Sequence, residues 1–87
     1  LHLLRVMIDY SLSFNAKHGS FPTFYPSDLA ILVAKVSPLE ENPAKTVRRA
    51  VKRLADLGHL TDVSATAGSV AVNREALRRI VAARAGL

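Results

Sequence analysis

The sequence predicts a mainly α-helical fold with one small β-hairpin, an α+β arrangement that takes in residues 1–87 as a single domain. Two observations carry this prediction. Apolar residues recur with a helical period in four separate stretches, and each stretch is bounded by residues that start or stop helices. Between the third and fourth stretches, two short alternating apolar runs flank a loop of small residues with one glycine, which is typical of a β-hairpin.

The first helix is expected to run from Leu1 to about His18 and to end at Gly19. Two apolar stripes run along it. The first stripe consists of Leu1, Leu4, Ile8 and Leu12. The second stripe consists of Leu3, Met7, Tyr10 and Phe14. A helix that is apolar on two sides is buried on two sides, either as the central helix of one domain or with the first stripe against a second copy. The first stripe is therefore the candidate dimer contact.

Residues 19–26 contain two prolines and are expected to form a loop or a short extended segment. The aromatic side chains of this segment either pack under the domain or stack on the bases of a nucleic acid. These residues are Phe21, Phe24 and Tyr25. A second helix is expected to start with Ser27 as its N-cap and to run to about Val36, because Pro38 ends it. Its expected inner face consists of Leu29, Leu32, Val33 and Val36.

The third helix has the clearest ends. Asn42 suits the N-cap, Pro43 suits the first helical position, and Gly58 suits the left-handed residue after the last turn. With the helical period, its apolar residues share one arc, namely Ala44, Val47, Ala50, Val51, Leu54 and Leu57. Its basic residues share the opposite arc, namely Lys45, Arg48, Arg49 and Lys52, with Arg53 at the edge. One face is therefore expected to be buried and the other to present positive charge.

The hairpin is expected to pair residues 60–63 with residues 70–72. Asn73 is expected to cap a last helix from Arg74 to about Arg84. The expected inner positions of that helix follow the same helical spacing. They are Ala76, Leu77, Ile80 and Val81.

Composition narrows the function. The net charge is +5, and five of the twelve basic residues lie in the third predicted helix, which indicates a polyanion as partner. The chain has no cysteine, and its three histidines show no metal-ligand spacing. It also lacks a glycine-rich phosphate loop and a nucleophile–base set. We therefore expect no enzyme, no catalytic residue, no metal, no cofactor and no small-molecule substrate.

Location and completeness are expectations of the same kind. The most apolar stretches are too short to span a membrane, and no signal peptide is visible. The chain begins at Leu1, so we expect a fragment of a longer protein. A cytoplasmic, nucleoid-associated, bacterial protein is the expected setting.

Two segments resemble the winged helix-turn-helix superfamily of DNA-binding proteins. Residues 46–60, Thr-Val-Arg-Arg-Ala-Val-Lys-Arg-Leu-Ala-Asp-Leu-Gly-His-Leu, are similar to its recognition helix and first wing strand. Residues 19–30, Gly-Ser-Phe-Pro-Thr-Phe-Tyr-Pro-Ser-Asp-Leu-Ala, are similar to the entry into the second helix in plasmid and phage replication or regulatory proteins. The resemblance implies one winged-helix domain over residues 1–87. Two departures are the extended turn from Pro38 to Asn42 and a hairpin without Lys or Arg.

Sequence-specific binding to double-stranded DNA is the expected function, with the third helix in the major groove. The residues expected to bind DNA are Asn42, Lys45, Thr46, Arg48, Arg49, Lys52 and Arg53. Candidates for contacts to the DNA backbone are Ser27, Ser64, Thr66, Ser69, Arg74 and Arg78. The expected setting is plasmid- or phage-type replication, segregation or transcriptional regulation. The alternative is a winged helix that binds proteins within a larger assembly.

Overall fold

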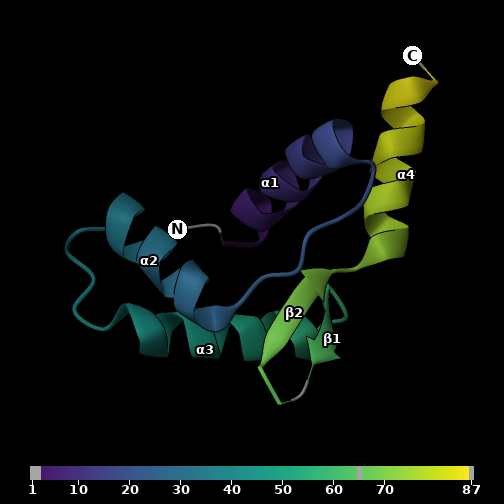
Figure 1. Cartoon of the computed structure of the whole chain (residues 1–87). Coiled ribbons are helices and arrows are strands. Elements are labelled where there is room, and N and C mark those ends of the chain that lie inside the picture. Colours follow the sequence, from purple (N-terminus) through teal and green to yellow (C-terminus); the bar gives the residue numbers. More distant parts are fainter. Residues whose placement is uncertain (1–2, 65, 87) are drawn as a thin grey trace.

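The computed structural model describes residues 3–64 and 66–86. In these residues the chain forms four helices and one two-stranded antiparallel sheet (Figure 1). The elements in chain order are α1 (Leu3–His18), α2 (Pro26–Val36), α3 (Pro43–Asp56), β1 (Leu60–Ser64), β2 (Ser69–Val72) and α4 (Arg74–Ala85). The predicted α+β class and the predicted order of elements are confirmed.

The ends of α3 are built as its sequence predicts. The Asn42 side-chain oxygen accepts a hydrogen bond from the backbone N–H of Lys45 at 3.1 Å, and Pro43 is the first helical residue. At the other end, the N–H of His59 donates a hydrogen bond to the carbonyl of Leu54. The N–H of Gly58 donates a second hydrogen bond to the carbonyl of Ala55. This pair of bonds is the Schellman motif, and Gly58 takes the left-handed conformation (φ 82°) that the motif requires.

α4 is tied to the end of α3 through its own cap. The Asn73 side-chain oxygen accepts hydrogen bonds from the N–H groups of Glu75 and Ala76, at 3.0 and 3.2 Å. Its side-chain N–H donates to the carbonyl of Gly58 at 3.1 Å. Asn73 therefore starts α4 and fixes that start against the turn that ends α3.

The start of α2 differs from the prediction. The helix begins at Pro26, with Tyr25 at the N-cap position, so Ser27 lies inside the first turn and is not the cap. No side chain supplies a cap hydrogen bond there. Pro26 explains the difference, because its fixed φ suits the first helical position and it drives the preceding residue into extended geometry.

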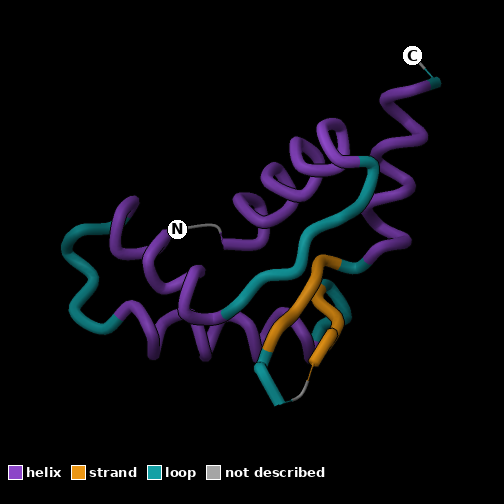
Figure 2. Tube along the Cα trace, in the orientation of Figure 1, coloured by secondary structure: helices purple, strands orange, loops and turns teal. Residues whose placement is uncertain are grey.

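The extended segment before α2 adds to the sheet. β1 and β2 pair in antiparallel register, with Leu60 opposite Val72 and Asp62 opposite Val70, and the register shifts between Asp62 and Ser64. On the other edge of β2, Phe24 and Val70 exchange two backbone hydrogen bonds of 2.7 and 2.9 Å. β2 therefore runs between β1 and the segment that carries this one-residue bridge (Figure 2). All four residues of β2 are buried. The sequence predicts an extended stretch here but does not indicate its pairing partner.

The hydrophobic core lies where α1, α2, α3, β2 and α4 meet. Its fully buried centre includes Met7, Val33 and Val47. Ser11 is also buried, and its hydroxyl donates to the carbonyl of Met7 at 2.7 Å, which removes the cost of burying it. The core thus fixes one face of α3 from the inside.

Tyr10, in the second predicted stripe of α1, is 54% exposed in the middle of the helix, so that stripe is not buried along its whole length. On the other helices, four more residues predicted to face inward are exposed. They are Val36, Ala44, Leu57 and Ala76. Each lies in the first or last turn of its helix or just beyond it. The helical period continues to the end of a helix, but the elements that would cover these positions do not reach that far.

Candidate nucleic-acid interface

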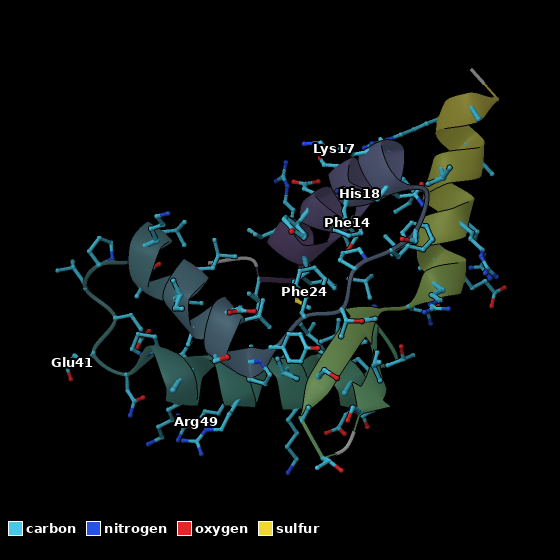
Figure 3. All side chains as sticks on the ribbon, viewed as in Figure 1. Phe14, Lys17, His18, Phe24, Glu41 and Arg49 are labelled. Atoms are coloured by element: carbon cyan, nitrogen blue, oxygen red, sulfur yellow. The ribbon has the colours of Figure 1, made fainter. Side chains whose placement is uncertain are left out.

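The exposed face of α3 carries the positive charge that its sequence predicts. Val47 is completely buried on the inner side, and Ala50, Val51 and Leu54 pack beside the core. The basic side chains on the other side are all exposed, namely Lys45, Arg48, Arg49, Lys52 and Arg53. In Figure 3 the labelled Arg49 lies on the edge of α3 that points away from α1 and α4. Because the apolar face of α3 is buried against the core, its basic face points toward solvent.

These cations are not neutralised by acidic neighbours in the part of the chain that the structure describes. The ion pair found there joins Arg79 to Glu75 on α4, at 2.8 Å. The sequence of α3 contains one acid, Asp56, at its last residue. The charge of the basic face is therefore available to an external anion.

The side chains of Asn42 and Thr46 are less available to a ligand than the basic side chains beside them. The Asn42 oxygen is engaged as the helix cap, so a bidentate contact to adenine would have to share or break that hydrogen bond. Thr46 is half-buried. The start of α3 thus offers Lys45 and Arg49 to a ligand more readily than Asn42.

The turn between α2 and α3 places acids near the same helix end. A Glu40 carboxylate oxygen accepts a hydrogen bond from the N–H of Asn42 at 3.3 Å. Glu41 is exposed and points outward from this turn (Figure 3). A polyanion approaching α3 would therefore be repelled at the Glu41 end and attracted along the rest of the basic face.

The hairpin offers little to an anion. Ser69 is only 2% exposed, so it cannot contact a ligand, contrary to the sequence prediction. The Ser64 hydroxyl oxygen accepts a hydrogen bond from the N–H of Ala67 at 3.3 Å and stabilises the turn. Thr66 is exposed, but so is Asp62 on β1. Thr66 is therefore the hairpin residue best placed for a contact to a phosphate.

The remaining backbone candidates lie apart from one another. Ser27 is exposed in the first turn of α2. Arg74 and Arg78 are exposed on α4 and line a hollow with the end of α1, in which α3 takes no part. This hollow could not be predicted from the sequence, because its walls come from three elements with no shared motif.

The predicted dimer stripe is not a continuous surface. Leu1 lies outside the described residues, and Leu12 is 8% exposed and belongs to the core. Leu4 and Ile8 are half-buried and line a groove of about 630 Å³ that α1 shares with α3. A dimer through α1 stays a prediction, and Leu12 cannot take part in it while the core is intact.

Two further findings concern residues 3–64 and 66–86. They contain no group of three or more His, Asp or Glu side chains arranged to hold a metal ion. None of their helices has the length and apolar character needed to cross a membrane.

Comparison with known proteins gives no assignment. No protein-family model matches the chain, and neither the curated proteins nor the solved structures contain a significant match.

Proposed function

We propose that this chain is a winged helix-turn-helix domain that binds double-stranded DNA through α3. One observation carries the proposal: α3 holds five exposed cations on one face, and its opposite face is fixed in the core. No ion pair within the described residues occupies those cations. A rigid helix with one uncompensated basic face is the element that DNA-binding domains place in the major groove.

The order of elements supports the winged-helix assignment. In the winged-helix fold, a helix, a short strand, two further helices and a hairpin follow one another in this order. Here α1, the Phe24 bridge, α2, α3 and the β1–β2 hairpin follow in that order. The bridge supplies the short first strand, which the helices and hairpin alone would lack.

The side chains of α3 divide by length and position into two roles. Lys45, Thr46 and Arg49 lie in its first half, and Arg can bond the O6 and N7 atoms of guanine together. Arg48, Lys52 and Arg53 flank them and suit contacts to phosphates, which give affinity without base preference. Specificity in this proposal rests mainly on Arg49. The biological setting is replication, segregation or transcriptional regulation of the plasmid or phage type.

Binding to a pool of random DNA duplexes tests the proposal. Fluorescence anisotropy should show an affinity that falls steeply with salt, with a slope of about −0.9 for each phosphate contacted. Sequencing the retained duplexes would then define the site, and a palindrome would indicate two copies per site. Absence of binding at low salt would overturn the proposal and favour the alternative of a protein-binding winged helix, which the cation-free hairpin suits.

A further inference from the structure

A second basic cluster lies away from α3. Arg74 and Arg78 are one turn apart on α4 and both line a hollow of about 500 Å³. Its opposite wall comes from Asn15 near the end of α1 and from Ser20 and Phe21 in the following loop. The volume falls within the range of small-ligand pockets in proteins.

The hollow is positive and has no acid in its lining. Glu75 is the acid nearest in sequence, and it is paired with Arg79. Within the described part of α4, Arg74 and Arg78 have no such ion-pair partner. Two guanidinium groups on one helix face can hold the oxygens of one phosphate together, each through charge-assisted hydrogen bonds.

The positive charge here comes from side chains and not from the helix N-terminus. The N–H groups of Glu75 and Ala76 in the first turn of α4 already donate to Asn73. Asn15 and Ser20 add a side-chain amide and a hydroxyl to the rim, which can donate to further phosphate oxygens.

The rest of the lining is apolar. Phe21 and Val81 are both half-buried beside the core and also border the hollow. An aromatic ring next to a basic rim matches a ligand in which a phosphate is joined to a planar or apolar group. The phosphate would lie at Arg74 and Arg78, and the planar group would lie on Phe21.

We propose that this hollow binds a small organic phosphate of nucleotide size, at a site separate from the basic face of α3. None of the residues that line this hollow comes from α3, and Figure 1 shows the end of α1 beside α4, away from the first half of α3 that carries Arg49. A duplex seated on Arg49 therefore does not fill the hollow. The proposal goes beyond DNA binding and does not depend on it.

Titration of the ¹⁵N-labelled chain with AMP tests this inference, with inorganic phosphate and adenosine as the two halves of the probe. We expect AMP to bind with a Kd of about 1 mM or tighter, and more tightly than either half. The amide signals that move should be those of Ser20, Phe21, Arg74 and Arg78. Movement confined to Lys45–Arg53, or no movement at all, would overturn the proposal.

Variants separate this site from the α3 face. Arg74→Gln with Arg78→Gln should weaken AMP binding by about tenfold or more, because each loses a charge-assisted hydrogen bond. Arg84→Gln is the control on the same helix, because Arg84 is exposed, does not line this hollow and takes no part in the Glu75–Arg79 ion pair, so it should leave AMP binding unchanged. Equal loss in the control would overturn the proposal.

DNA provides the last arm of the test. Arg48→Ala with Lys52→Ala and Arg53→Ala should keep AMP binding, whatever it does to DNA binding. If the Arg74 and Arg78 double variant weakens DNA binding and AMP does not bind the parent, the hollow is a contact to the DNA backbone and the small-ligand proposal is wrong.

Discussion

α3 and α4 carry most of the positive charge of this chain and arrange it differently. α3 has its cations on one arc, opposite a completely buried Val47 and with one acid at its last residue. α4 has one arginine paired with Glu75, and turns Arg74 and Arg78 toward a concave surface. The number of cations on the two helices is similar, so pairing and surface shape decide what each helix can bind. A convex, unpaired basic face suits a long polyanion, and a concave one suits a small anion.

The largest expected effect is the loss of DNA affinity when cations are removed from the basic face of α3. Replacing Arg48, Lys52 and Arg53 together with Ala should weaken binding to all duplexes by about a hundredfold or more near 0.1 M salt. The salt slope should become shallower by about one unit for each phosphate that the variant no longer binds. Anisotropy titrations over a salt series measure both quantities.

The control for that triple variant has the same change in net charge. Lys17, Lys35 and Arg84 are exposed cations outside α3, and replacing all three with Ala also removes three charges. This variant should lose little affinity. If it loses as much as the α3 variant, net charge and not the α3 face accounts for the binding.

The inner face of α3 gives the second prediction. Val47→Ala should lower the free energy of unfolding by about 1–3 kcal/mol, because it leaves a cavity at a completely buried position. Arg49→Ala, two residues away on the exposed face, should change it by less than about 0.5 kcal/mol. Urea unfolding, monitored by circular dichroism, measures the free energy of unfolding of both variants. Similar values for both would mean that α3 is not anchored through Val47.

The third prediction concerns base readout on the exposed face. Arg49→Ala should reduce discrimination at one or two base pairs by about 1–3 kcal/mol and leave non-specific binding nearly unchanged. Thr46→Ala should act at a neighbouring position with a smaller effect, because Thr46 is half-buried. Selection from random duplexes reports this as a flattened preference. An unchanged preference in both variants would locate the reading residues elsewhere, with Asn42 the next candidate.

The smallest effect is expected on α4. The side chains of Arg79 and Glu75 are 75% and 76% exposed, so their ion pair contributes little to stability. Arg79→Ala should lower the free energy of unfolding by no more than about 0.5 kcal/mol. A loss above about 1 kcal/mol in urea unfolding would show that this pair holds α4 in place.

The features that could be predicted from the sequence are those with local causes. Asn42, Asn73 and Gly58 fix helix ends through bonds to residues within a few positions, and each acts as expected. The direction of the basic face could also be predicted, because it follows from the helical period of the apolar residues opposite it.

The features that could not be predicted depend on contacts between distant residues. The bridge from Phe24 to Val70 joins positions far apart in the sequence, and no local pattern selects that partner. The burial of Leu12 and Ser69 likewise follows from which elements pack over them. The hollow at Arg74 and Arg78 requires α1, a loop and α4 to meet, so the sequence shows its arginines but not its shape.

The bridge at Phe24 also helps to protect the small sheet against edge-to-edge pairing with another copy. An open strand edge is a template for another strand, and unprotected edges lead to aggregation. In β2, Val70 is hydrogen-bonded to Phe24 on one side, and β1 covers the other side. On the other edge of the hairpin, β1 has five residues, an exposed Asp62 and a register shift next to it. A charge and an irregularity on a short edge are the devices by which natural sheets prevent edge-to-edge pairing.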